Sequence, residues 1–126
     1  MSQRILVVED DPALMIVISR SLSGRGYEVE TAENGVEALG RLSSEAEFDL
    51  LLSDIVMPEM DGLELALMAT AQFPKLKVVL MSGYASEWRR TVNLENVIHG
   101  VLNKPFSLDE MHQKIAEVLA APQRAA

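Results

Sequence analysis

Hydrophobic residues along this chain occur in short runs, separated by segments with helical spacing. Most of the runs are dense in apolar and β-branched residues, which is typical of strands buried on both faces of a sheet. One run, residues 27–31, alternates polar and apolar positions and predicts an edge strand. The predicted strands cover residues 4–8, 27–31, 49–53, 76–81 and 97–102.

Between these runs, apolar residues recur at the spacing of helix faces. The first such segment is apolar almost all round, whereas the fourth is short and weakly patterned. The predicted helices cover residues 13–22, 63–73 and 86–92, a segment with Val36, Leu39 and Leu42, and a last segment with the stripe Leu108, Met111, Ile115 and Val118.

Residues at the helix ends support these assignments. Pro12 is suited to a first helical turn, and Asn34 is suited to cap the second helix. Pro74 stops the third. Ser107 and Glu110 have the spacing of a capping box, which predicts the start of the last helix.

The alternation of strands and helices predicts an α/β fold with one domain, residues 1–121, followed by a short tail, residues 122–126. We expect a doubly wound, five-stranded parallel sheet with five helices on both faces. In such sheets, ligands bind outside the carboxyl ends of the strands. The candidate chemistry should therefore be sought where the strands end.

Polar residues of a particular kind stand at those ends. Glu9 and Asp10 follow the first strand, Asp54 the third, Ser82 the fourth and Lys104 the fifth. Carboxylates brought within about 4 Å of one another repel by roughly 4 kcal/mol per pair at an effective dielectric constant of 20. Positive charge is needed to offset this repulsion, and the lysine supplies only part of it.

A divalent cation held by oxygen atoms would supply the rest. Mg²⁺ fits best, because it keeps several water molecules and binds one or two carboxylates together with a phosphate. Asp54 is then the natural nucleophile, since an ionised carboxylate can attack phosphorus and hold it as an acyl phosphate. The metal and Lys104 would offset charge on the phosphoryl oxygens, and Ser82 would donate a hydrogen bond to them.

Four motifs together resemble the receiver domains of two-component response regulators. They are ILVVEDDP from residue 5, LLLSDIVMPEMDG from residue 50, VVLMSGYA from residue 78 and LNKPF from residue 102. The resemblance covers residues 5–119 and implies a flavodoxin-like fold with strand order 2-1-3-4-5. It also implies that Asp54 receives phosphate from a phosphohistidine on a histidine kinase or a histidine phosphotransfer protein. Such a domain is a phosphoacceptor that assists its own phosphorylation and dephosphorylation, and is not an enzyme.

The resemblance also implies individual roles. Asp10 and Asp54 would bind Mg²⁺ directly, Glu9 would act through water, and the carbonyl of Val56 would complete the shell; Mn²⁺ can take the same place. Lys104 and Ser82 would hold the phosphoryl oxygens. We interpret Asp11, one place beyond the acid pair, as a charge at the start of the first helix.

The chain departs from the family at the aromatic residue that, in many receivers, moves when the domain is phosphorylated. Many receivers carry Tyr or Phe three positions before the lysine, and this chain has Val101. Tyr84 could substitute for that ring, or it could simply cover a loop. Trp88 falls where receivers present their output face, although a lone Trp also serves as a core anchor. Phosphorylation would reposition Ser82 and its loop, and through them the face with Trp88.

The first helix predicts a partner surface, because one apolar face remains after it packs on the sheet. The resemblance implies that phosphodonors dock on this helix, so we expect Met15 or Val17 to be exposed and to contact the donor; deeper burial under the neighbouring helix is the alternative. Few residues follow the last helix, so we expect no DNA-binding output domain in this chain. Output would pass to a downstream protein target by protein contact.

The amino-acid composition further narrows the classes of protein to which this chain can belong. Nineteen acidic against eleven basic residues give a net charge of −8, which disfavours direct nucleic-acid binding. The absence of cysteine excludes disulfides and thiolate metal sites. No apolar stretch approaches the ~18 to 20 residues of a membrane span, and no secretory signal is evident. We expect a cytoplasmic protein that does not bind membranes.

Three rival functions are weighed against the phosphoacceptor. An aspartyl phosphatase would usually carry a second acid where Val56 stands. A flavin carrier would need a phosphate loop where Glu9, Asp10 and Asp11 would repel phosphate. The stronger alternative is an adaptor with a receiver fold that binds partners independently of phosphorylation, as Val101 suggests.

Overall fold

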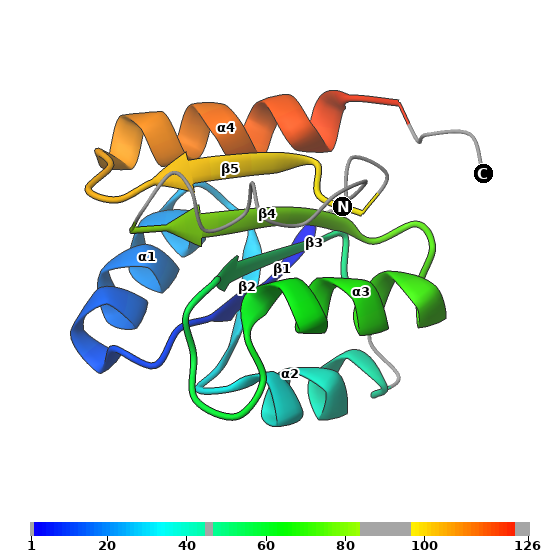
Figure 1. Cartoon of the computed structure of the whole chain (residues 1–126). Coiled ribbons are helices and arrows are strands. Elements are labelled where there is room, and N and C mark those ends of the chain that lie inside the picture. The colour runs from blue at the N-terminus through cyan, green and yellow to red at the C-terminus, as the bar shows by residue number, and fades with distance from the viewer. Residues whose placement is uncertain (1, 45–46, 84–96, 123–126) are drawn as a thin grey trace.

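The five predicted strands pair into one parallel sheet in the order β2-β1-β3-β4-β5, which confirms the predicted doubly wound α/β fold (Figure 1). The computed structural model describes residues 2–44, 47–83 and 97–122. Strand order reverses between β1 and β3, so their carboxyl ends flank the place where such folds bind ligands. The strands are β1 (Arg4–Val8), β2 (Glu28–Ala32), β3 (Leu50–Asp54), β4 (Lys77–Ser82) and β5 (Gly100–Asn103).

Helices cover both faces of the sheet. One face carries α1 (Pro12–Gly24) and α4 (Leu108–Ala120), and the other carries α2 (Gly35–Leu42) and α3 (Gly62–Gln72) (Figure 1). The helix expected near residues 86–92 lies outside the described residues. Within the described ranges, no helix is long and apolar enough to cross a membrane.

Each face of the sheet has its own apolar core, because alternate side chains of a strand point to opposite faces. Ile5 and Val7 pack in the core beneath α1 and α4. Leu6 and Val8 pack in the other core, beneath α2 and α3. All four side chains are fully buried. The continuous apolar run at residues 4–8 is therefore a strand covered on both sides, as predicted.

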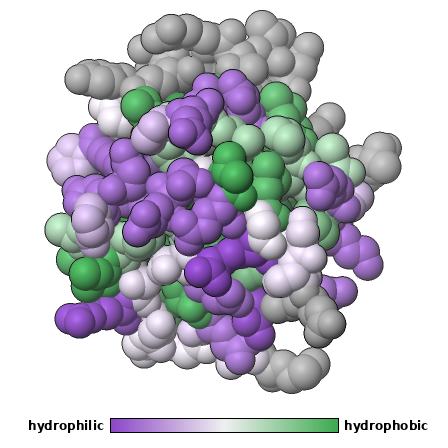
Figure 2. Space-filling model, turned by 90° about the horizontal axis from the view of Figure 1, so that it is seen from below, coloured by the Kyte–Doolittle hydropathy of each residue, from purple (hydrophilic) through white to green (hydrophobic). Residues whose placement is uncertain are grey.

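The outer surface over α2 and α3 is mostly polar. Figure 2 views the molecule from this side and shows hydrophilic residues over most of it, with hydrophobic residues gathered in smaller areas. The exposed large apolar side chains of these two helices are Val36, Leu67 and Met68.

Side-chain caps fix the helix starts. Asp11 accepts hydrogen bonds from two backbone N–H groups in the first turn of α1, which confirms its assignment to the helix start. Asn34 caps α2 as predicted. Ser107 and Glu110 form the predicted capping box of α4, each side chain accepting the other's backbone N–H.

Strand β5 begins at Gly100 and not at residue 97. The reason lies at His99, whose Nδ1 accepts the backbone N–H of Val78 at 3.0 Å while its own N–H donates to the Val78 carbonyl at 2.7 Å. An imidazole nitrogen here takes the place of a strand carbonyl, so the regular ladder starts one residue later. The expected strand at residues 97–102 was too long at its amino end.

The apolar stripe of α4 is shorter than predicted. Met111, Ile115 and Val118 are buried, but Leu108 is 41% exposed. Leu108 is the first residue of the helix. It lies beyond the part that packs on the sheet, although it shares the helical spacing of the other three.

Lys77 is a buried lysine within a strand that the sequence pattern marks as apolar. Its ammonium group donates hydrogen bonds to the carbonyls of Val118, at 3.0 Å, and Leu119, at 3.2 Å, and to that of Ala121. These carbonyls end α4, where a cation also complements the helix dipole. The lysine thereby ties the start of β4 to the last turn of α4.

The edge strand β2 carries a charged network. Arg4 of β1 pairs with Glu28 at 3.1 Å and with Glu30 at 2.9 Å, and Arg41 of α2 reaches Glu30 at 3.4 Å. β2 lies at one edge of the sheet, as its alternating pattern predicted, although it is shifted one residue along the chain from the expected 27–31.

Candidate functional site

The predicted site residues at the strand ends gather at the carboxyl edge of the sheet. Glu9, Asp10 and Asp54 each offer an oxygen atom within 4.8 Å of the others. Glu9 is 1% exposed and Asp54 7%, whereas Asp10 is exposed. Two buried carboxylates beside a third form an acidic pocket that could bind a metal ion.

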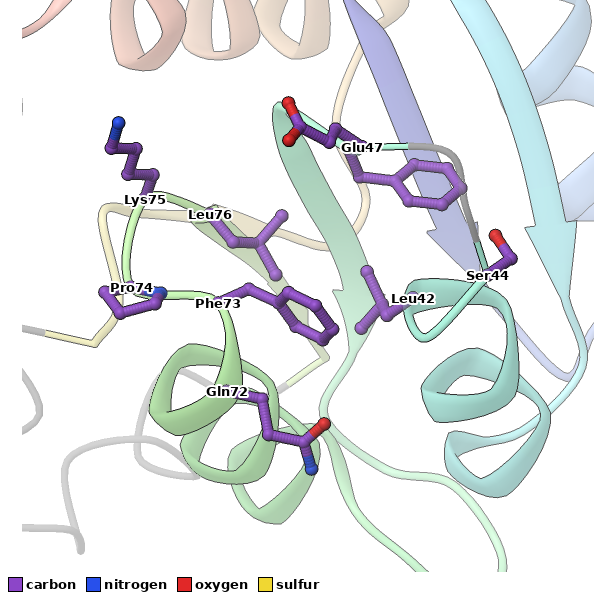
Figure 3. A pocket seen from close by; sticks show the side chains of 9 residues that line it. Leu42, Ser44, Glu47, Gln72, Phe73, Pro74, Lys75 and Leu76 are labelled. Carbon is purple, nitrogen blue, oxygen red and sulfur yellow. The ribbon is translucent and has the colours of Figure 1, made fainter.

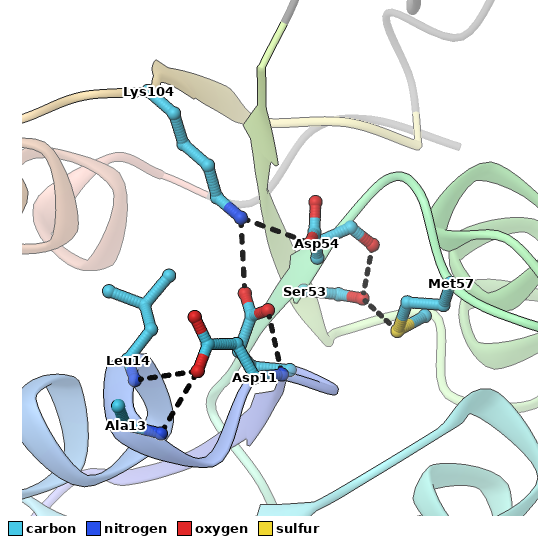
Figure 4. A network of polar contacts seen from close by, with 8 residues as sticks. Asp11, Ala13, Leu14, Ser53, Asp54, Met57 and Lys104 are labelled. Carbon is cyan, nitrogen blue, oxygen red and sulfur yellow. Dashed lines mark hydrogen bonds and ion pairs between the residues drawn. The ribbon is translucent and has the colours of Figure 1, made fainter.

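Lys104 bridges two of these acids. Its Nζ lies 3.0 Å from Oδ2 of Asp54 and 3.3 Å from Oε2 of Glu9 (Figure 4). Burial lowers the pKa of the lysine, but the hydrogen bond and charge of Asp54, assisted by Glu9, outweigh that effect and the pKa is raised. The ammonium is therefore held firmly in its charged form.

Glu9 is the acid of the cluster whose ionised form is disfavoured. Burial, followed by the negative charge of Asp54, raises the pKa of Glu9 to about 6, although a hydrogen bond from the Asp11 backbone and the charge of Lys104 oppose the shift. Lys104 alone thus does not neutralise this pocket. A further cation would stabilise the ionised form of Glu9.

Asp54 is held by its strand and by its neighbours. It ends β3 opposite Met81 of β4, and the next residue, Ile55, extends the pairing with a 3.0 Å bond from its N–H to the Met81 carbonyl. The hydroxyl of Ser53 donates to the Asp54 carbonyl at 2.9 Å and lies 4.0 Å from Sδ of Met57 (Figure 4). The sequence pattern did not single out Ser53, because a serine before a strand end has no distinctive signal.

Ser82 ends β4 and is buried, with 1% exposed. Its register partner in β5 is Asn103, and the N–H of Lys104 donates to the Ser82 carbonyl at 2.7 Å. The serine and the lysine therefore enter the same edge from neighbouring strands, on the far side of Asp54 from β1.

The other predicted site residues are not among the side chains that form the acidic pocket. Val56 lies in the loop after β3, with 61% of its side chain exposed. Val101 is half-buried and packs against the core beneath α2 and α3. Tyr84 and Trp88 lie outside the described residues.

The outer face of α1 is apolar. Val17 is 49% exposed, which confirms the prediction that Met15 or Val17 is exposed. Ile16 is exposed to the same extent, whereas Met15 is half-buried. Next to this face, Leu14, Val17 and Ile18 of α1 line a hollow of about 550 Å³ that Lys104 also lines. From the other side it is lined by Gly83, Pro105, Phe106 and Leu108. The apolar surface thus adjoins the acidic pocket.

A second hollow, of about 620 Å³, lies at the other end of the sheet, where β4 begins and where α2 and α3 end. Figure 3 shows Leu42, Phe73 and Leu76 directed into it and the ammonium end of Lys75 directed away. The acidic site residues do not line it. Its lining is Leu42, Ser44, Glu47, Phe48, Gln72, Phe73, Pro74, Lys75 and Leu76.

The fold and the acidic site define a signalling receiver, and comparison with known proteins agrees. Residues 5–116 match the family model of the response regulator receiver domain, and the chain belongs to that family. It is 40% identical over 119 residues to the response regulator receiver protein CpdR of Brucella abortus, covering 94% of this chain and 98% of CpdR.

Two longer relatives match over the same length. Response regulator MprA of Mycobacterium tuberculosis is 38% identical over 119 residues, and the match covers 94% of this chain and 51% of MprA. The sensor kinase CckA of Brucella abortus is also 38% identical over 119 residues, which are 94% of this chain and 13% of that protein.

Solved structures agree with the fold. A CheY-like receiver domain from Methanospirillum hungatei superposes with a TM-score of 0.87 at 34% identity, covering 94% of each chain. Response regulator TrrA of Thermotoga maritima, solved in complex with Mg²⁺ and BeF, gives a TM-score of 0.82 at 33% identity, covering 92% of this chain and 98% of TrrA.

Proposed function

We propose that this chain is the phosphoacceptor of a two-component phosphorelay, and that Asp54 receives the phosphoryl group from a phosphohistidine. One observation carries the proposal: the buried Asp54 carboxylate lies among two further acids and 3.0 Å from the Lys104 ammonium. A nucleophile for phosphorus and a cation for the phosphoryl oxygens thus share one pocket.

In the proposed reaction, a carboxylate oxygen of Asp54 forms a bond to phosphorus while the bond from phosphorus to the histidine nitrogen breaks. The imidazole leaves with that electron pair, and an acyl phosphate remains on the aspartate. Lys104 would exchange its contact with the Asp54 carboxylate for one with a phosphoryl oxygen. The hydroxyl of Ser82 would donate a hydrogen bond to another.

The acidic pocket fits Mg²⁺, and Mn²⁺ has the same ligand preference for oxygen. Asp10 and Asp54 would bind the ion directly, Glu9 through water, and the carbonyl of Val56 would complete the protein ligands. Among the described residues, two of the acids are buried beside one lysine, and the raised pKa of Glu9 supports the binding of a further cation there. Such an ion would neutralise charge on the transferring phosphoryl group.

The partner that supplies the phosphoryl group would be a histidine kinase or a histidine phosphotransfer protein. The exposed side chain of Val17 lines the hollow that Lys104 also lines, so a donor packed there would lie next to the lysine that contacts Asp54. The similarity to part of the sensor kinase CckA supports this class of partner.

Output would pass by protein contact to a downstream target. The added phosphate brings roughly −1.5 to −2 units of charge next to Ser82. Ser82 ends β4, and the chain continues from there toward the residues that include Trp88. A movement of this serine would therefore shift the segment that follows it.

A second candidate function is an adaptor that binds its partner whether or not it is phosphorylated. Val101 favours it, because a half-buried valine packed on the core has no ring to rotate when Ser82 moves. Partner affinity measured with and without Mg²⁺ and beryllofluoride separates the two. Equal affinities favour the adaptor, and a change of tenfold or more favours the switch.

The proposed function is tested by labelling with a phosphorylated histidine phosphotransfer protein. Asp54→Asn should abolish labelling and leave the fold intact, since the amide is nearly isosteric. Asp11→Asn is the matched control, because it removes a neighbouring charge while an asparagine still caps α1. Stoichiometric labelling of Asp54→Asn at another residue would overturn the assignment.

A further inference from the structure

Gly62, the first residue of α3, lies against the backbone of Asp54. A Cβ atom added at Gly62 would lie 2.2 Å from the Asp54 carbonyl oxygen, 2.9 Å from Cα of Ile55 and 3.0 Å from the Asp54 carbonyl carbon. These are backbone atoms at the end of the central strand β3 and of the residue after it, so they cannot turn aside as a side chain can. The close approach is possible only for glycine.

Hydrogen bonds on both the α3 side and the β3 side hold Gly62 against the Asp54 backbone. The N–H of Gly62 donates to the Ile55 carbonyl at 2.7 Å, and the N–H of Ile55 donates to Met81 of β4 at 3.0 Å. Asp61 caps α3 by accepting the N–H of Glu64 at 2.8 Å. The start of α3 is thereby docked on the end of β3, across the loop between them (Figure 1).

We infer that Gly62 is a positioning residue for the phosphoacceptor: its missing side chain lets the start of α3 hold the Asp54 backbone where the carboxylate meets Lys104 and the other acids. The inference rests on the proposed function and adds a residue that touches none of the reacting atoms. An alanine would force α3 and Asp54 apart by about 1 Å to reach ordinary contact. Misplacement on the order of 1 Å can cost about 10²-fold in rate.

Two other helical glycines provide matched controls. Gly35 also opens a helix directly after a capping residue, but an added Cβ there meets only the side chain of Met60, at 2.8 to 3.0 Å. Gly40 lies within α2 and has no atom within 4 Å of an added Cβ. Alanine at all three positions changes helix propensity in a similar sense but pushes on the phosphoacceptor at Gly62 alone.

The experiment measures labelling of the three alanine variants by acetyl phosphate at saturating Mg²⁺, and their Mg²⁺ affinity by calorimetry. In the labelling step, the bond from phosphorus to the acetyl oxygen breaks and acetate leaves. We expect Gly62→Ala to label 10- to 100-fold more slowly and to bind Mg²⁺ at least threefold more weakly. Gly35→Ala and Gly40→Ala should stay within twofold of the unchanged chain in both measurements.

A result within twofold for Gly62→Ala, or an equal loss in Gly35→Ala, would overturn the inference. If the unchanged chain is not labelled, the proposed function fails, and the Mg²⁺ affinities still test Gly62 by themselves. Should Gly62→Ala not fold, a pair of cap variants replaces it. Asp61→Ala should slow labelling and weaken Mg²⁺ binding two- to fivefold more than Asn34→Ala, which removes the equivalent cap of α2; equal effects would overturn the inference.

Discussion

Lys104 and Asp54 form a 3.0 Å ion pair although their strands, β5 and β3, are separated by β4. The lysine side chain spans that strand at the carboxyl edge of the sheet, where Ser82 ends β4. In the proposed reaction, this cation would therefore lie beside a phosphoryl group carried by Asp54.

Replacing Lys104 should separate metal binding from phosphoryl transfer. Lys104→Met removes a cation that competes with Mg²⁺, so we expect Mg²⁺ affinity to rise by about tenfold or more. Labelling at saturating Mg²⁺ should fall on the order of 10²-fold, because a charge on the phosphoryl oxygens is lost. Calorimetry and labelling kinetics measure the two effects, and Lys104→Arg, which keeps the charge, serves as the control. Parallel losses in both quantities would contradict this account.

Val17→Asp should impair the protein donor alone. A charge on the exposed apolar face of α1 disfavours packing of a partner there, so labelling by a phosphotransfer protein should slow by about tenfold. Labelling by acetyl phosphate should be unchanged, since that donor needs no docking surface. Val36→Asp is the control, because Val36 on α2 is even more exposed, at 59% against 49% for Val17. If both donors slow together, Val17 acts through the site and not through docking.

Lys77→Met should destabilise the fold without touching the site. The variant keeps the apolar stem but removes the buried ammonium that binds the carbonyls at the end of α4. Leaving such carbonyls without their donor costs about 1 to 3 kcal/mol in the free energy of unfolding. Urea denaturation measures the loss. Arg20→Met, at an exposed position of α1, should change stability by less than about 0.5 kcal/mol.

His112 should make stability depend on pH. Its Nε2 lies 2.7 Å from Oγ of Ser21 in α1. Burial, and then the positive charge of Arg25, lowers the pKa of His112 against the weaker opposing effect of Asp109. The unfolded chain therefore takes up a proton at higher pH than the folded one, and the stability that His112 provides is complete above its ordinary pKa near 6.5 and is lost as pH falls below that value.

The measurement is the difference in unfolding free energy between the unchanged chain and His112→Gln from pH 8 to pH 5. Taking the difference removes the contribution of Glu9, whose raised pKa acts in the opposite sense between its ordinary value and about 6. We expect the advantage of the unchanged chain to shrink steadily below pH 6.5. A difference that stays constant over this range would show that His112 does not titrate differently on folding.

Much of the fold could be predicted because the pattern follows from burial alone. The run at residues 4–8 is apolar without alternation, and β1 is covered on both faces. The grouping of Glu9, Asp10 and Asp54 followed from the rule that parallel strands end at one edge. Neither prediction required knowledge of a contact between specific side chains.

The features that escaped prediction depend on such contacts. A lysine at the start of an apolar run gives no sign that Lys77 turns inward to the carbonyls that end α4. His99 replaces a backbone acceptor with a ring nitrogen, which shortened β5 against expectation. The role of Gly62 depends on how closely the start of α3 approaches Asp54, since an added Cβ would lie 2.2 Å from the Asp54 carbonyl oxygen, and no spacing along the chain encodes that approach.

The charged network on β2 has a consequence for the protein at high concentration. An open sheet edge offers unpaired N–H and carbonyl groups to any extended chain. At this edge, an incoming strand would have to strip water from Glu28 and Glu30 and disturb their pairs with Arg4. The network therefore disfavours fibril-like self-association along the β2 edge. Replacing Glu28 and Glu30 with neutral residues would make such association easier.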